Sequence, residues 1–229
     1  MKVDVAESHS AKEVQFFTEQ AESGKYSLCG VIASGRPENA GFDAYLDDIT
    51  SPRLKALRRV LHTVDDSISQ GTAFRKNIQL LGQRELPFDL CISPSQHTVG
   101  IELIDACPDT QFVLDHCGNP NISEPSSFAA WQQTLTAIAE RSNVTAKLSG
   151  IVASGTADCI NLEAVQPYLD ATLEAFGHKR LVWGSDWPVC ELTTELPTWI
   201  KIFRKWLNQF SDEEQQAIAN LNAKKLYKI

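Results

Sequence analysis

The sequence lacks any apolar run long enough to cross a membrane, and no apolar segment of the kind found in signal peptides follows its first residues. It also lacks an excess of basic residues, because 21 lysines and arginines face 29 aspartates and glutamates, for a net charge of −8. That charge argues against nucleic acid and anionic membranes as partners. We therefore expect a cytoplasmic protein that acts on a small molecule.

The sequence has no Cys-x-x-Cys pair, although it contains six cysteines, at positions 29, 91, 107, 117, 159 and 190. We therefore expect reduced thiols rather than a disulfide framework or a cysteine metal site. With 43% hydrophobic residues, the 229-residue chain can bury a full core. No Gly/Ser-rich or charge-rich linker divides the chain, so we expect one domain over residues 1–229.

Short apolar stretches alternate with amphipathic segments along the whole chain, which predicts strands followed by helices. Ser10 and Glu13 form the pattern of a capping box at the start of the first helix, and Ser211 and Glu214 form it at the last. Residues 68–81 are expected to be mostly helical. This alternation is typical of a parallel sheet. The predicted strands are residues 2–8, 28–33, 54–61, 88–92, 112–114, 144–148 and 181–183.

Two architectures compete for such a sheet. An open, doubly wound sheet usually carries a glycine-rich phosphate turn after its first strand, but Ala6-Glu-Ser-His-Ser10 stands there. Polar residues directly follow several strands, as in (β/α)8 TIM barrels, whose sites lie at the carboxyl ends of the strands. We therefore favour the barrel, with one strand–helix unit fewer than eight. The polar residues in question are Glu7, His62, His116, Ser149 and Asp186.

Two of the buried strands end in a titratable residue that could do chemistry. Asp186 follows the strand 181–183, and His116 follows the strand 112–114. Taken singly, Asp186 fits a turn cap and His116 a hydrogen-bonded structural histidine. A carboxylate at the end of a buried strand is costly without a partner or a task. The pair therefore suggests one shared site, and His62 and His97 are expected in loops or at the surface.

Three motifs support a family resemblance: Val113-Leu-Asp-His-Cys-Gly-Asn-Pro120, Lys147-Leu-Ser-Gly150 and Trp183-Gly-Ser-Asp-Trp-Pro-Val-Cys190. They resemble the amidohydrolase-related TIM-barrel lactonases, a group with fuconolactonase-like, rhamnonolactonase-like and pyrone-dicarboxylate-lactonase-like enzymes. The resemblance runs from Val3 to the end and includes Phe88-Asp-Leu90 and the closing Asn222-Ala-Lys-Lys-Leu-Tyr227. It implies a metal-dependent-hydrolase type of barrel that opens a sugar-acid or carboxylated lactone.

The resemblance also implies roles for single residues. By motif, His116 falls on a late-strand histidine and Asp186 on the final aspartate, so both are expected to be catalytic and, if zinc is bound, to be its ligands. Asp186 would be the general base for an attacking water. Arg58 falls on an arginine that binds a substrate carboxylate or carbonyl. Trp187 is expected in the wall of the substrate site.

The first-strand His-x-His pair of the wider superfamily has no counterpart in the sequence. Lactones are activated esters, and part of this group resembles enzymes that work without a metal, so both a divalent metal such as Zn²⁺ and metal-independent catalysis stay open. The same gap leaves a second hypothesis open, that of a catalytically inactive barrel remnant serving as a binding or interaction module. Without that strand two sheet edges would lack a partner, so we expect association into a homo-oligomer.

Overall fold

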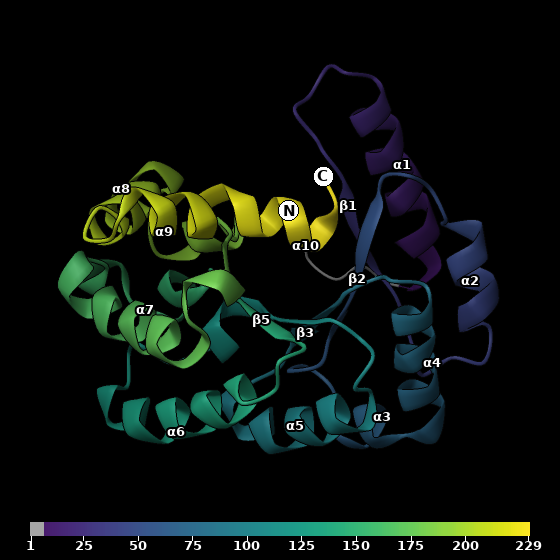
Figure 1. Cartoon of the computed structure of the whole chain (residues 1–229), viewed down its shortest axis with the longest axis horizontal. Coiled ribbons are helices and arrows are strands. Elements are labelled where there is room, and N and C mark those ends of the chain that lie inside the picture. Colours follow the sequence, from purple (N-terminus) through teal and green to yellow (C-terminus); the bar gives the residue numbers. More distant parts are fainter. Residues whose placement is uncertain (1–6) are drawn as a thin grey trace.

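The computed structural model describes residues 7–229, and its centre is a six-stranded parallel sheet (Figure 1). The strands follow one another in the order β1-β2-β3-β4-β5-β6, and helices alternate with them, so the predicted parallel arrangement is confirmed. Among residues 7–229 no pairing joins β1 to β6. The strands are β1 (Val31–Ser34), β2 (Leu54–Val60), β3 (Phe88–Cys91), β4 (Phe112–Leu114), β5 (Val144–Leu148) and β6 (Leu181–Trp183).

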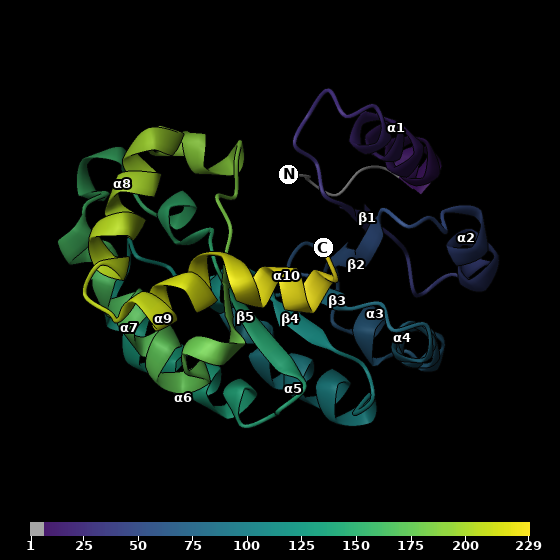
Figure 2. The ribbon, with the colours of Figure 1, turned by 45° about the horizontal axis from the view of Figure 1, so that its top comes forward.

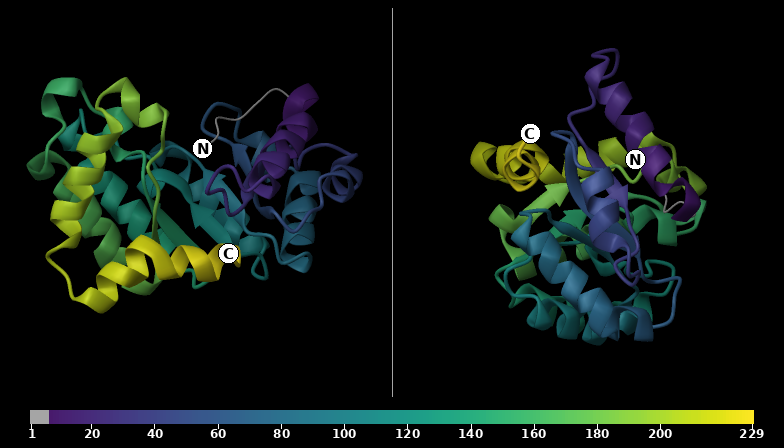
Figure 3. Two further views of the ribbon diagram at one scale, coloured as in Figure 1. Left: turned by 90° about the horizontal axis from the view of Figure 1, so that it is seen from above. Right: turned by 90° about the vertical axis from the view of Figure 1, so that its right-hand side faces the viewer.

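Helices cover the sheet on several sides (Figures 2 and 3). Helices α5 and α6 lie on one side of the strands, and α10 lies on the other (Figure 2). None of the helices in residues 7–229 is long and apolar enough to cross a membrane. The helices are α1 (Ser10–Glu22), α2 (Phe42–Asp48), α3 (Ser67–Gln70), α4 (Thr72–Gln83), α5 (His97–Ala106), α6 (Phe128–Ala139), α7 (Leu162–Phe176), α8 (Leu196–Leu207), α9 (Asp212–Gln216) and α10 (Asn222–Tyr227).

The amino-terminal predictions are only partly met. Residues 2–6 of the strand predicted at 2–8 lie outside the described residues, and Glu7–His9 forms a 3₁₀ turn instead. Helix α1 begins at Ser10, but the predicted capping box is wrong. The Ser10 side chain is buried inside the first turn, and its hydroxyl has no hydrogen-bond partner among the described residues. A residue that is already helical cannot act as the N-cap.

Two further helix predictions have different outcomes. The helix predicted over 68–81 is divided, because Gly71 adopts an extended backbone with ψ 140° and separates α3 from α4. The capping box at Ser211 is confirmed: its hydroxyl accepts a hydrogen bond from the backbone N–H of Glu214, whose carboxylate accepts one from the backbone N–H of Ser211. Local sequence determines a cap fully only where the chain enters the helix from an extended conformation, as it does there.

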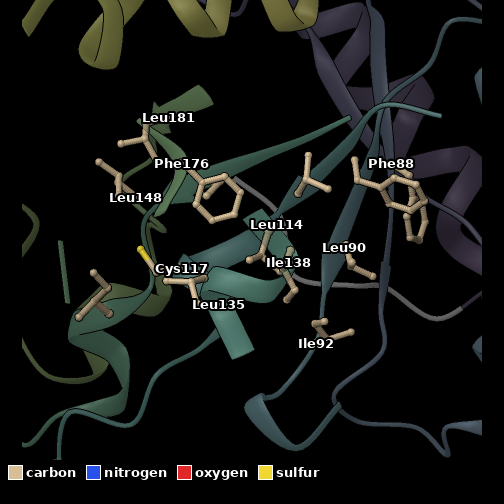
Figure 4. Packing of buried hydrophobic residues seen from close by; sticks show 14 of the residues in the cluster. Phe88, Leu90, Ile92, Leu114, Cys117, Leu135, Ile138, Leu148, Phe176 and Leu181 are labelled. Carbon is tan, nitrogen blue, oxygen red and sulfur yellow. The ribbon is translucent and has the colours of Figure 1, made fainter. Parts of the chain in front are cut away.

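The core fills the space between the strands and their covering helices (Figure 4). Phe88 of β3 meets Phe74 of α4 and Phe112 of β4 edge to face, with ring centroids 6.1 Å apart in both pairs. Each such pair stabilises the fold by about 0.5–1.5 kcal/mol beyond the area it buries. The strands are thereby held as a stiff platform, and their carboxyl ends present side chains in defined positions.

Candidate functional site

Charged and polar side chains from five neighbouring strands meet in one cavity of about 330 Å³. Side chains within β2, β3 and β5 face it, and the residues directly after β4, β5 and β6 complete it. Parallel strands place these positions on one side of the sheet, which is where active sites of such folds lie. The lining side chains that matter for chemistry are Arg58, Asp89, His116, Lys147, Ser149 and Asp186.

Lys147 of β5 joins two buried carboxylates. Its ammonium donates to Asp89 of β3 at 2.6 Å and also to Asp115, which directly follows β4. Both carboxylates are fully buried, so each needs a cationic partner, and Lys147 serves both. The Tyr227 hydroxyl of α10 donates to the second oxygen of Asp89 at 3.3 Å. The end of the chain is thus tied to the floor of the cavity.

Burial and charge act against each other in this group. Burial by itself raises the pKa of Asp115, but Lys147, His116 and Arg58 outweigh it and hold the pKa well below its usual range. Burial lowers the pKa of Lys147, yet its two carboxylate partners raise it above the ordinary value. For Asp89 burial prevails over Lys147, so its pKa is raised. Lys147 and Asp115 are therefore charged across the whole neutral range.

His116 lies in an unusual backbone conformation just after β4. Its φ is 56°, in the left-handed region that residues with a Cβ seldom adopt. Its Nδ1 lies 2.8 Å from the hydroxyl of Ser149. Gly150 is packed directly beneath the ring, because a Cβ at Gly150 would come within 2.5 Å of the His116 side chain. The ring therefore has one orientation, with Nε2 pointing toward Asp186.

Asp186 faces His116 from the end of β6. Its Oδ1 lies 3.8 Å from Nε2 of His116, too far for a direct hydrogen bond but close enough for one atom to bridge the two groups. The residue is 9% exposed, and its φ of 54° is again left-handed. Burial raises the pKa of Asp186 although His116 opposes this. A carboxylate with a raised pKa is the better base near neutral pH.

Arg58 reaches the cavity from β2. It is 9% exposed, and its Nη1 lies 3.6 Å from Oδ2 of Asp115. Among the described residues neither the Nε of Arg58 nor that Asp115 oxygen has a hydrogen-bond partner. A guanidinium on the wall of a cavity can bind an anionic or carbonyl oxygen.

The structure thus brings together Arg58, His116 and Asp186, three of the four residues proposed from the sequence. It does not place the fourth, Trp187, in the cavity. Trp187 is 46% exposed, is absent from the cavity lining, and donates from its indole nitrogen to Glu191 at 3.0 Å. The left-handed turn at Asp186 directs the next side chain outward.

His62 is exposed as expected. The prediction that His97 lies in a loop or at the surface is wrong, because His97 is fully buried at the start of α5.

Sequence reasoning assigned no role to Lys147, Asp89 or Tyr227. A signal did exist for the first two, because each interrupts a short strand that is otherwise apolar or small. A charged residue in a buried strand needs a partner of opposite charge, so Asp89 and Lys147 could have been proposed as partners. Tyr227 carried no such signal, since 138 residues separate it from Asp89.

The donor set for a metal is incomplete in residues 7–229. His116 and Asp186 present two donors to one point, whereas catalytic zinc usually has three protein ligands. A second group of three possible ligands consists of Cys91, Asp115 and His116. Its ligand atoms, a thiol sulfur, a carboxylate oxygen and a ring nitrogen, all lie within 4.8 Å of one another. A second cation fits poorly there, because the ammonium of Lys147 already contacts Asp115. The described residues therefore do not by themselves make a zinc site.

The chain is similar to several known proteins. A family model described as amidohydrolase matches residues 12–229. An L-fucono-1,5-lactonase of Burkholderia ambifaria is 30% identical over 142 residues, which are 62% of this chain and 48% of that protein. The chain spans about half the length of the curated relatives it matches, between 43% and 54%.

Two solved structures show the fold. An amidohydrolase from Burkholderia multivorans with bound zinc superposes with a TM-score of 0.90 at 24% identity, covering 95% of this chain and 79% of that one. A probable 2-pyrone-4,6-dicarboxylic acid hydrolase from Acinetobacter baumannii with bound citric acid has a TM-score of 0.70 at 17% identity, covering 94% of this chain and 89% of that one. The α/β barrel fold class predicted from the sequence is confirmed.

Proposed function

Because the chain belongs to the amidohydrolase family, we propose that it hydrolyses a lactone of a sugar acid or of a ring that carries a carboxylate. The observation that carries this proposal is the 3.8 Å gap between His116 Nε2 and Asp186 Oδ1, inside a cavity that Arg58 also lines. An oxygen of a water or of a carbonyl group that lies beside this pair can be within hydrogen-bond distance of both atoms. The names of the L-fucono-1,5-lactonase relative and of the pyrone-dicarboxylic acid hydrolase neighbour support a lactone as substrate.

Asp186 is the general base in this proposal. Its carboxylate takes a proton from water as the water oxygen attacks the lactone carbonyl carbon. The new C–O bond forms, and the electron pair of the C=O bond moves onto the carbonyl oxygen. Burial raises the pKa of Asp186, which makes its carboxylate a stronger base than an exposed one.

His116 and Arg58 stabilise the negative charge that develops. If the Ser149 hydroxyl donates to Nδ1, Nε2 of His116 carries a proton and can donate to the carbonyl oxygen. Arg58 binds the substrate carboxylate or adds a second donor to the same oxygen. When the ring C–O bond breaks, the protonated Asp186 returns its proton to the leaving alkoxide, so the base is regenerated.

None of these reaction steps passes through a metal. His116 and Asp186 stay the proposed ligands if zinc binds, and a bound zinc would supply an acidified water. A single domain over residues 1–229 and association into a homo-oligomer also remain predictions.

The test is hydrolysis of a panel of sugar-acid and carboxylated lactones by the folded 229-residue chain, followed as acid release with a pH indicator. Asp186→Asn should lower turnover by on the order of 10³-fold or more, because the water then has no base. Asp48→Asn, at the exposed end of α2, is the matched control and should leave the rate unchanged. No hydrolysis of any lactone by a folded wild-type chain would overturn the proposal, and lactone binding without turnover would favour a binding module.

A further inference from the structure

We propose that His97 and Trp131 are positioning residues, which hold the turn that carries His116 and so direct its Nε2 into the cavity. This inference rests on the function proposed for His116, and it concerns two side chains that do not line the cavity. Both lie behind the turn, on the helices α5 and α6 that cover the outer side of the sheet (Figure 2).

The turn itself is conformationally unfavourable. Four consecutive residues have a positive φ: His116 at 56°, Cys117 at 53°, Gly118 at 71° and Asn119 at 55°. Three of them carry a Cβ, which disfavours this region of backbone space. Such a run persists only where the surroundings determine it, and strained runs of this kind occur at functional sites.

Three side-chain hydrogen bonds hold the turn in place, two from residues outside it and one from a residue within it. The indole nitrogen of Trp131 donates to the carbonyl of Cys117 at 2.9 Å. Nε2 of His97 lies 2.9 Å from the carbonyl of Gly118. The side-chain amide of Asn119 donates to the carbonyl of Ile92, just after β3, at 2.7 Å. The turn is therefore tied to α6, α5 and β3 at successive residues, and the peptide units on the carboxyl side of His116 have no freedom to rotate.

The protonation of His97 follows from its two partners. A carbonyl can only accept, so the nitrogen that faces Gly118 must carry the proton. A neutral imidazole has one N–H, so Nδ1 must then accept from the Thr134 hydroxyl, which lies 2.7 Å away and is nearer to Nδ1 than to the carbonyl of Trp131, another acceptor at 3.0 Å. Burial lowers the pKa of His97 to about 4, in agreement with a neutral ring. Thr134 thus selects the tautomer of His97 that can hold the turn.

The packing around Gly118 is equally specific. A Cβ at Gly118 would lie 2.7 Å from Nε2 of His97, so only glycine allows the imidazole to come this close. Gly118 therefore serves both the left-handed backbone and the approach of His97. On the cavity side the His116 ring is held by Ser149 and Gly150. The catalytic ring is fixed from both sides, by cavity residues in front and by His97 and Trp131 behind.

The experiment compares isosteric pairs. Thr134→Val keeps the volume of the side chain and removes the hydroxyl, whereas Thr134→Ser keeps the hydroxyl. His97→Leu removes the donor to Gly118, whereas His97→Gln retains an amide N–H that can reach the same carbonyl. Trp131→Phe removes only the indole N–H and part of the ring. We expect Thr134→Val, His97→Leu and Trp131→Phe to lower kcat by about 10- to 100-fold, with KM changed less than about threefold, because a misplaced catalytic group costs on the order of 10² in rate. Thr134→Ser and His97→Gln should recover most of the loss.

A second measurement makes the result independent of turnover. The ¹⁵N shifts of the His116 ring report its tautomer and its hydrogen bonds by NMR. We expect the three disruptive variants to change these shifts, while the two conservative variants keep the wild-type shifts. Unchanged His116 shifts and an unchanged kcat in folded Thr134→Val and His97→Leu would overturn the inference. A wild-type chain that hydrolyses no lactone would refute the proposed function alone, since the NMR comparison would still decide whether His97 and Trp131 position the ring.

Discussion

Replacing Lys147 with methionine tests whether the buried charge group at the floor of the cavity is held together by one cation. The ammonium contacts Asp89 and Asp115, both with fully buried side chains. Methionine keeps most of the length of the side chain and removes the charge. After the change Asp115 still has Arg58 at 3.6 Å, but Asp89 retains only the Tyr227 hydroxyl at 3.3 Å. One carboxylate is thus left in the interior without a cation.

Removing one partner of a buried ion pair costs about 3–5 kcal/mol, so Lys147→Met should lower the free energy of unfolding by about that amount at pH 7. Since a domain of this kind is stable by about 5–15 kcal/mol, most of the protein should still fold. The loss should shrink as the pH falls, because Asp89 can take up a proton and become neutral. Each pH unit returns at most about 1.4 kcal/mol, so up to about 2.7 kcal/mol should be recovered between pH 7 and pH 5.

The assay is urea-induced unfolding of wild type and variant at pH 7 and pH 5, followed by tryptophan fluorescence and circular dichroism. Lys201→Met, on the exposed side of α8, is the matched control and should change the free energy of unfolding by less than about 0.5 kcal/mol. A loss below 1 kcal/mol for Lys147→Met at pH 7 would refute the reasoning. So would an equally large loss at both pH values, because the penalty would then not come from an unpaired carboxylate.

Three further predictions concern the cavity. Activity should fall as the pH falls through the pKa of Asp186, which burial places above the ordinary 3.8. Between the pKa of Asp186 in the unfolded chain and its higher pKa in the folded protein, the free energy of unfolding should fall as the pH rises, because the folded state holds the proton more tightly. The pH profile of kcat/KM measures the first effect, and urea unfolding of wild type and Asp186→Asn measures the second. Gly150→Ala should reduce kcat/KM at least tenfold, because its Cβ would press on His116, whereas Gly177→Ala, with a similar φ of 65° and open space around it, should lose stability alone. Chelation with EDTA should leave the lactone hydrolysis of the chain unchanged, because His116 and Asp186 are two donors where catalytic zinc usually has three, and the group of Cys91, Asp115 and His116 already contacts the ammonium of Lys147 through Asp115. Loss of activity that zinc restores would contradict that view.

Much of the fold could be predicted because each strand is a short apolar run and each helix has an apolar face. Periodicity identifies which side of an element is buried, and it needs no knowledge of partners. The positions of His116 and Asp186 followed from the same pattern, since both come directly after apolar strands and the carboxyl ends of parallel strands share one edge. What this pattern could not supply is the direction of a side chain in an irregular turn. Trp187 therefore proved exposed and His97 buried, contrary to expectation.

The sequence by itself thus determined the order of strands and helices, the family of the chain and the two strand ends where His116 and Asp186 lie. Only the tertiary structure decided which charges pair. Lys147 of β5 meets Asp89 of β3 across 58 residues of sequence, because both strands pair with β4 and so bring the two side chains into one buried space. A charged residue in an apolar strand shows that a partner of opposite charge is needed, but the sequence does not identify that partner. That choice depends on strand register and on the side chains that enclose the cavity, and both exist only once the sheet has formed.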